Sequence, residues 1–196
     1  MGTKAGQHTR SAILDQAARL ATVDGLDGLS LGNLARATGM SKSGLYAHFG
    51  SKEELQLATI DAARDTFVRE VVQPALDAPR GLPGLRVACE AFLSYVERRV
   101  FPGGCFFSSA AAEVGTRRGK VRDSIAARQR EWLDLLEALA RAAQEAGELP
   151  ADVDAAQLAF EVNAILVAAN TSFMLQEDPA ALKRAREAIA ERLPRS

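Results

Sequence analysis

The stretch from Ser30 to Phe49, SLGNLARATGMSKSGLYAHF, limits the possible folds more than any other part of the chain. Ser30 can cap a short helix by accepting a hydrogen bond from a backbone N–H that has no helical partner. Gly39 can adopt the positive φ that a tight turn requires, and Ser41 can cap a second helix two residues later. Two short helices joined in this way form the helix-turn-helix pattern, so we expect a DNA-reading motif here.

The second short helix, residues 42–49, separates an apolar face from a small polar one. Leu45 and Phe49 are four residues apart, so they share a face, which we expect to be buried. The opposite face is small and uncharged at its centre, so its backbone can approach base edges while longer side chains at its flanks reach phosphates. The candidate DNA contacts on this helix are Lys42, Ser43, Gly44, Tyr46, Ala47 and His48. For the histidine, a surface or capping role is an equal alternative to a phosphate contact.

Polar residues at the starts of neighbouring helices extend the candidate DNA surface. Thr9 and Arg10 begin a helix expected over residues 9–23, and helix N-termini present free N–H groups to phosphates. Residues 1–8 are expected to form an arm. Ser51 and Glu54 have capping-box spacing, so a fourth helix should begin there, with Lys52 beside a phosphate or simply exposed. The remaining candidate contacts are the capping residues Ser30 and Ser41.

From Arg10 to Leu55 the sequence resembles the DNA-binding domain of the tetracycline-repressor-like (TetR) family of bacterial transcription regulators. The matching segments include Gly39-Met40-Ser41-Lys42, Leu45-Tyr46, His48-Phe49 and Ser51-Lys52-Glu53-Glu54-Leu55. The resemblance implies an all-helical homodimer that a small ligand releases from DNA, with Lys52 on a phosphate. Gly44 departs from the pattern, since many relatives carry threonine, serine or alanine there. That departure bears on the operator sequence and leaves the groove-binding role in place.

Charge is unevenly distributed along the chain. The formal net charge of the 196 residues is −1. Through Lys52 there are six basic and three acidic residues, which gives +3, and the remainder has 18 against 22, which gives −4. Because phosphate binding requires a local positive surface, the overall balance does not argue against nucleic acid.

The composition excludes several other classes. With two histidines, both near the N-terminus, and no HExxH or Glu-x-x-His pair, the chain lacks the ligands of a zinc or di-iron site, so we expect no metal, no cofactor and no enzymatic activity. Two cysteines do not form a disulfide framework, which favours the cytoplasm. No signal peptide is visible, and no stretch approaches the roughly 18 consecutive apolar residues of a membrane span.

The remainder of the chain shows helical periodicity interrupted by glycine and proline. Helices are expected to run from Ser51 to Pro74 or soon after, over 85–100, from about 105, over 120–146, and from caps at Asp154 and Asp178. The expected fold is therefore all-α with about nine helices. Residues 1–52 would form a three-helix helix-turn-helix DNA-binding domain, and residues 53–196 a helical effector-binding and dimerisation domain.

The helical body should contain an effector pocket and a dimer interface. Aromatic residues and two asparagines on apolar helix faces suggest a mainly hydrophobic cavity for a small molecule, although core packing or contacts across a dimer explain the same residues. The candidate pocket residues are Phe92, Tyr95, Cys105, Phe106, Trp132, Asn163, Asn170, Phe173 and Met174. For the homodimer, the last two helices offer Leu158, Val162, Leu166, Leu182, Ala185 and Ile189, or these faces complete the core of one subunit.

Together these features predict a ligand-responsive bacterial transcription regulator, most simply a repressor, that binds palindromic operator DNA as a homodimer. The alternative is a helical adaptor that binds proteins and has lost DNA binding. The adaptor alternative is disfavoured by outward-facing groups that suit a DNA groove and that an adaptor does not need: Lys42, Ser43, Tyr46 and Lys52.

Overall fold

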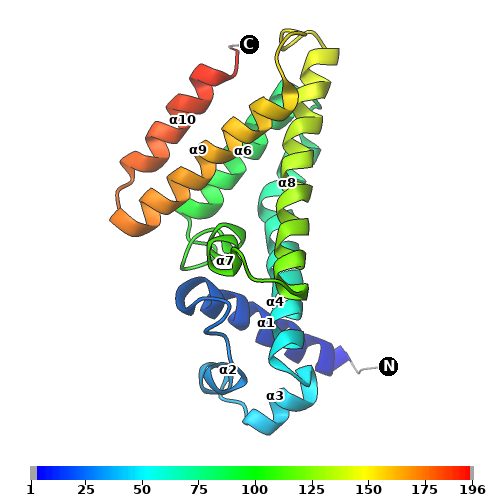
Figure 1. The fold of residues 1–196 in the computed structure, drawn as a ribbon, viewed down its shortest axis with the longest axis vertical. Helices are drawn as coiled ribbons and strands as arrows, with labels where there is room; N and C mark the ends of the chain where they lie inside the picture. Colours follow the sequence, from blue (N-terminus) through cyan, green and yellow to red (C-terminus); the bar gives the residue numbers. More distant parts are fainter. Residues whose placement is uncertain (1–3, 195–196) are drawn as a thin grey trace. The chain divides into compact units, whose positions relative to one another are not determined.

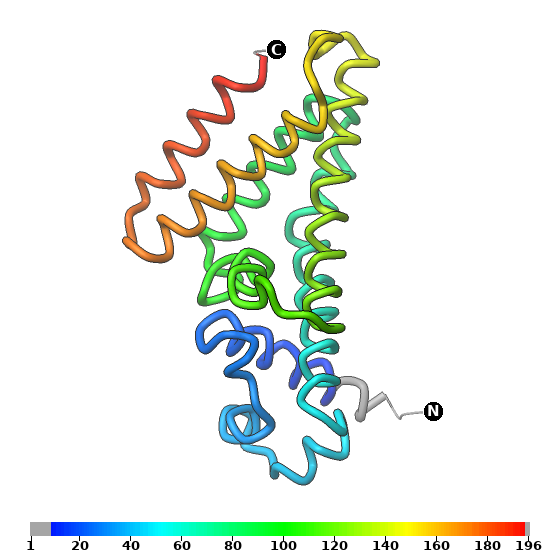
Figure 2. The backbone as a smooth tube through the Cα atoms, in the orientation of Figure 1, coloured from blue at the N-terminus to red at the C-terminus, as the bar shows by residue number. Residues whose placement is uncertain are grey.

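The computed structural model describes residues 4–194, and all regular structure in that range is helical (Figures 1 and 2). Because α4, a π-helical segment and α5 follow one another without a break, these residues form nine continuous helical stretches, which confirms the expected all-α fold. The bounds are α1 Lys4–Asp24, α2 Leu31–Thr38, α3 Lys42–Phe49, α4 Lys52–Phe67, the π segment Val68–Val72, α5 Gln73–Asp77, α6 Leu82–Glu97, α7 Phe106–Val114, α8 Lys120–Glu145, α9 Ala155–Gln176 and α10 Ala180–Arg192.

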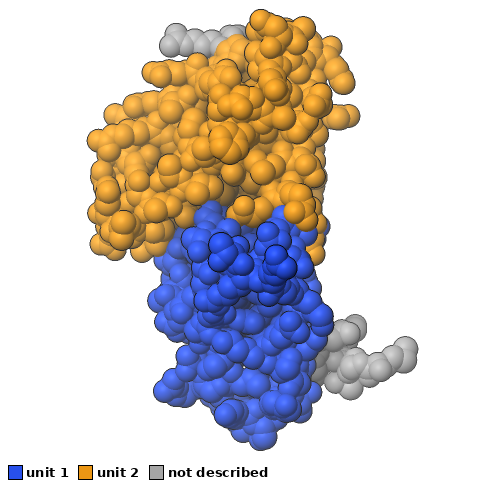
Figure 3. All heavy atoms as spheres, viewed as in Figure 1, with its two compact units in different colours: residues 1–66, 101–127 blue, residues 67–100, 128–196 orange. Residues whose placement is uncertain are grey.

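The chain divides into two compact units, coloured separately in Figure 3. Unit 1 contains the residues up to Thr66 together with residues 101–127, and unit 2 contains residues 67–100 and the chain from Arg128 onward. The division differs from the boundary expected at residue 52. Unit 1 holds the three N-terminal helices and, in addition, most of α4, all of α7 and the start of α8.

Unit 1 is built on the apolar stripe of α1. Ile13, Ala17 and Ala21 face inward and are almost fully buried, and α1 packs against both α2 and α7. The expected arm over residues 1–8 is corrected in part, because α1 begins at Lys4. The segment before Thr9 contains no proline, so nothing forces the helix to stop there. Residues 1–3 lie outside the described part of the chain.

The helix after the helix-turn-helix ends at Asp77, soon after Pro74, as expected. Proline has no N–H and crowds the carbonyl four residues earlier, which normally breaks a helix. Here the turn widens to π-helical hydrogen bonding over Val68–Val72, where the Gln73 N–H bonds to the Val68 carbonyl, and α5 continues to Asp77. A wider turn absorbs the proline without ending the helix.

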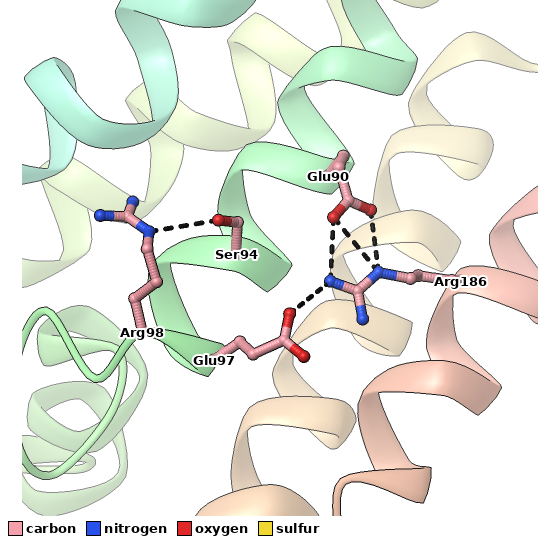
Figure 4. Close-up of polar contacts among 5 residues, drawn as sticks. All are labelled: Glu90, Ser94, Glu97, Arg98 and Arg186. Atoms are coloured by element: carbon pink, nitrogen blue, oxygen red, sulfur yellow. Dashed lines mark hydrogen bonds and ion pairs between the residues drawn. The ribbon is translucent and has the colours of Figure 1, made fainter.

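In unit 2, a charged network joins α6 to α10, as Figure 4 shows. Arg186 of α10 donates to both carboxylate oxygens of Glu90, at 3.0 and 2.9 Å, and to Glu97 at 2.7 Å. The hydrogen bonds that Arg186 donates to Glu90 and, with a smaller effect, to Glu97 raise the pKa of its guanidinium further above its usual value. Buried Leu182, Ala185 and Ile189 of α10 face inward as well, so α10 is fixed by apolar packing and by charge.

Candidate functional site

The helix-turn-helix of α2 and α3 has the capping geometry that its sequence predicts. Ser30 Oγ accepts from the Asn33 N–H at 3.1 Å, and Ser41 Oγ accepts from the Gly44 N–H at 3.0 Å. Between the helices, Gly39 has φ 67° and ψ 13°, the left-handed conformation that glycine adopts without steric cost. The turn and both helix starts therefore follow from local sequence.

The two faces of α3 also separate as expected. Leu45 is completely buried and Phe49 nearly so, which anchors the helix to unit 1. On the other side Lys42, Ser43, Ala47 and His48 are exposed, Gly44 is partly exposed, and Tyr46 has 58% of its surface exposed. An exposed tyrosine on a helix with this pattern is available to a partner, and the small residues beside it allow close approach of a flat surface.

The flanking candidates Arg10 and Lys52 have partners within the chain. The Arg10 guanidinium lies over the Phe49 ring, 5.2 Å from its centre, so its position is set by α3. Lys52 donates from Nζ to the Asp27 carbonyl at 2.5 Å. Because an ammonium group has three donors, Lys52 can make this bond and still contact a phosphate. Ser51 caps α4 by accepting from the Glu54 N–H at 3.1 Å, while its own N–H bonds to the Phe49 carbonyl, so only one half of the expected capping box forms.

The predicted pocket residues of unit 2 form an aromatic cluster. The Trp132 ring stacks on Phe92, with 6.1 Å between ring centres, and Phe67 meets Phe92, Tyr95 and Trp132 edge to face. Asn163 accepts a hydrogen bond from Trp132 Nε1 at 3.1 Å, so this asparagine has a partner within the chain. The cluster joins α6, α8 and α9 with the end of α4.

The other pocket candidates are distributed differently. Asn170 and Phe173 are buried on α9, Met174 is half-buried beside them, and the Arg99 guanidinium lies 5.5 Å from the centre of the Phe173 ring. Cys105 and Phe106 belong to unit 1, where Phe106 packs against Phe101 and Phe107. They are therefore part of a different packing group from Trp132.

The predicted dimer residues are corrected by their burial. All six are at most 6% exposed within their own chain, so they pack inside one subunit: Leu158, Val162, Leu166, Leu182, Ala185 and Ile189. The structure thus favours the alternative in which these faces complete the core of one subunit. The sequence could not decide between the two, because α9 is apolar on nearly all sides and its periodicity does not show which side faces inward.

A different apolar stripe of α9 remains exposed. Phe160 and Leu175 are 62% and 79% exposed, and spacings of three or four residues place Ala164, Ala168 and Thr171 on the same face. An open groove of about 480 Å³ beside the stripe is lined by residues of both α9 and α10, among them Phe160, Ile165 and Ala188. Among the described helices only α9 is long and apolar enough to span a membrane, which is weak evidence for a span, because its inner face packs in unit 2.

Two family models match the sequence. Residues 13–59 match the model described as "Bacterial regulatory proteins, tetR family", and residues 81–189 match "Tetracyclin repressor-like, C-terminal domain". The second match alone covers more than half of the chain.

Individual proteins of known identity are also similar. The transcriptional regulator AcuR of Cereibacter sphaeroides is 28% identical over 139 residues, which is 70% of this chain and 64% of AcuR, so the match spans just under two thirds of that relative. The crystal structure of a TetR transcriptional regulator from Chloroflexus aurantiacus is 29% identical with a TM-score of 0.89, and the match covers 96% of both chains. AibR, solved in complex with isovaleryl coenzyme A and operator DNA, is 26% identical with a TM-score of 0.74, over 94% of this chain and 97% of AibR.

Proposed function

This chain belongs to the TetR family of bacterial transcription regulators, and we propose that it is a repressor that binds palindromic operator DNA as a homodimer and is released by a small, mainly hydrophobic effector. Residues 1–52 carry the DNA contacts in this proposal, and residues 53–196 bind the effector and form the dimer. The protein acts in the cytoplasm and is not an enzyme.

The exposed face of α3 is the observation that carries the proposal. Leu45 and Phe49 fix the helix from behind, while Lys42 and Tyr46 extend from the opposite side. A helix inserted in the major groove needs this arrangement, with short side chains at base edges and longer ones at phosphates. We propose DNA contacts by the whole set predicted from the sequence: Thr9, Arg10, Ser30, Ser41, Lys42, Ser43, Gly44, Tyr46, Ala47, His48 and Lys52.

Selection from random duplexes tests DNA binding and finds the preferred operator in the same experiment. The full-length protein is incubated with a randomised pool of duplexes, and the best-bound duplex is then used in gel shifts at two salt concentrations. Affinity should fall steeply as salt rises, because phosphate contacts release counterions. Lys42→Ala should weaken binding, whereas Lys183→Ala, which removes an exposed lysine from α10, should not. If no duplex is enriched, the chain is better described as a helical adaptor.

The aromatic cluster of unit 2 supports an effector site. Phe92 and Trp132 present stacked rings beside the amide of Asn163, and hydrophobic surfaces with a few polar groups are typical of ligand sites. We propose that Tyr95, Phe173, Met174 and Asn170, which belong to the same unit, extend this site. Acyl coenzyme A esters are the first class to examine, since AibR was solved with one.

Trp132 is the only tryptophan of the chain, so its fluorescence reports directly on the cluster. Titration with isovaleryl coenzyme A should shift or quench the emission and should release the selected duplex in a gel shift. Coenzyme A without the acyl group is the matched control and should do neither. Equal responses to both compounds would contradict a site that recognises the hydrophobic part.

A further inference from the structure

The turn between α1 and α2 belongs to no helix, but it supports the helix-turn-helix of α2 and α3. Leu26 and Leu29 are each 1% exposed and anchor the turn in the core of unit 1. Its carbonyl groups are bonded by side chains: Gln56 Nε2 donates to the Leu26 carbonyl at 2.8 Å, and Lys52 donates to that of Asp27. The turn is thus held by α4, which follows the helix-turn-helix.

Two N–H groups of the same turn bond to a carboxylate from a distant part of the sequence. Glu113, in the last turn of α7, accepts from the Leu26 N–H through Oε2 and from the Asp27 N–H through Oε1, both at 2.6 Å. Leu26 and Asp27 lie 87 and 86 positions before Glu113 in the sequence. Both oxygens of one carboxylate are therefore used to hold two successive backbone donors.

Gly25 makes room for this interaction. It has φ 80°, and a Cβ atom at this position would lie 3.1 Å from each Glu113 carboxylate oxygen. A side chain here would be strained by its backbone conformation and would also crowd the carboxylate. The glycine and the glutamate therefore fit one another.

Residues 101–127, the segment that contains Glu113, make further contacts with the N-terminal helices and the start of α4. Arg117, three residues after the end of α7, pairs with the Asp27 carboxylate, and Lys120 lies 3.6 Å from Glu53 at the start of α4. The Gly103 N–H, before α7, donates to Thr22 Oγ1 at 3.1 Å. Residues 101–127 thus contact the N-terminal part of unit 1 at four places, although the match to the C-terminal family model includes residues 101–127.

We propose that Glu113 is a positioning residue for DNA recognition: by clamping Leu26 and Asp27 it sets where α2 begins, and α2 in turn sets the orientation of α3. Ser30 and Leu31 follow the turn directly, so a shift of the turn is passed to the first helix of the motif. The inference depends on the proposed function, since it gives Glu113 a role in a DNA complex.

Glu113→Gln is the informative variant, and Asp123→Asn is its matched control. Glutamine keeps the size of the side chain but replaces one acceptor oxygen with an NH₂ group, so one of the two hydrogen bonds is lost. Asp123 is an exposed carboxylate of the same segment, and it pairs with its sequence neighbour Arg122. Each variant removes one negative charge and so raises the net charge by one, which means that any general electrostatic gain in DNA affinity is shared by both.

Hydrogen exchange measured by NMR on the full-length protein tests the clamp itself. In Glu113→Gln, protection of the Leu26 and Asp27 amides should fall by about tenfold, the size expected for loss of a hydrogen bond to a charged group, while protection of the α8 amides should not change. Unchanged protection at these two amides would overturn the inference. A fall at every amide would also overturn it, because Glu113 would then support the fold in general.

DNA binding tests the consequence. Affinity of Glu113→Gln for the duplex selected by the wild-type protein should drop by about tenfold, while its binding to an unrelated duplex should match that of Asp123→Asn. Equal binding of the selected duplex by the two variants would overturn the inference about Glu113 but leave the proposed function in place. If the wild-type protein selects no duplex, the proposed function fails as well, and the exchange measurement still reports whether the clamp exists.

Discussion

At the scale of single residues, Glu177 stands out because it ends α9 in the left-handed conformation, with φ 53° and ψ 27°. This conformation costs a residue with a Cβ atom roughly 1 kcal/mol or more, and glycine adopts it freely. The ion pair of Glu177 with Arg99, at 3.5 Å, is exposed and contributes little.

Glu177→Gly should therefore raise the free energy of unfolding by about 0.5–1 kcal/mol, and the melting temperature by about 2–3 °C for a chain of this length. Thermal unfolding followed by circular dichroism is the measurement. Glu177→Ala removes the same ion pair but keeps the strain, so it should not stabilise the protein. Equal melting temperatures for the two variants would show that the backbone conformation costs little.

The two cysteines give a second prediction at this scale. Burial raises the pKa of the Cys89 thiol from 9.0 to about 12, and burial likewise raises the pKa of Cys105. A raised pKa keeps the thiol neutral, so any stability linked to it is complete below pH 9 and is lost as pH rises toward 12. Neither thiol should react with Ellman's reagent at about pH 8, slightly below the ordinary thiol pKa, until the protein is unfolded in denaturant. Rapid labelling of the native protein would argue for an exposed redox-sensitive cysteine.

At the scale of elements, residues 101–104 approach the end of α1 so closely that only glycine fits. A Cβ atom on Gly103 would lie 1.8 Å from the Thr22 carbonyl oxygen, which is backbone and cannot rotate away. Gly103→Ala must therefore separate the two segments and should destabilise the protein by about 1–3 kcal/mol in urea unfolding.

Gly32→Ala is the control for that substitution. Gly32 lies inside α2, and the nearest atom to its Cβ position is Ser30 Oγ at 3.8 Å, an ordinary contact. Alanine should stabilise the helix there by up to about 1 kcal/mol. Opposite signs for the two variants would confirm close backbone approach as the cause, and equal signs would refute it.

The elements also show what local sequence can and cannot predict. The caps at Ser30 and Ser41 and the turn at Gly39 were predictable, because the groups that bond lie within a few residues of one another. The π-helical turn over Val68–Val72 was not, since its wider hydrogen bonding has no signature in the local sequence. The Glu113 clamp escaped prediction for a related reason: its partner Leu26 is 87 positions away, and a glutamate in a helix resembles any exposed glutamate.

At the scale of the whole molecule, the sequence pointed to the last two helices for a dimer, but the residues it singled out lie on their inner faces. Leu158 and Leu182 are apolar and periodic because they fill the core of their own subunit. Only burial distinguishes them from Phe160 and Leu175, which are equally apolar but exposed. Exposed apolar stripes of this length on a protein surface usually mark an interface.

We expect two subunits to pack through the exposed stripe of α9. Its central residues are Ala164 and Ala168, whose small side chains allow two helices to approach closely, and Phe160 and Leu175 lie at either end. Ala168→Glu should convert the protein from a dimer to a monomer of 20.9 kDa, because two carboxylates would be buried opposite one another at the two-fold axis.

Multi-angle light scattering after size exclusion measures that change, and Ala190→Glu is the matched control. Ala190 is also exposed, but it lies on the side of α10 that faces α6, away from the stripe. Because Ala168 is exposed in one subunit, its variant should keep the helical content and the Trp132 environment of the wild-type protein. The monomer should bind one operator half-site weakly, since the second set of phosphate and base contacts is lost. A dimer that survives Ala168→Glu but not a substitution elsewhere would place the interface on another face.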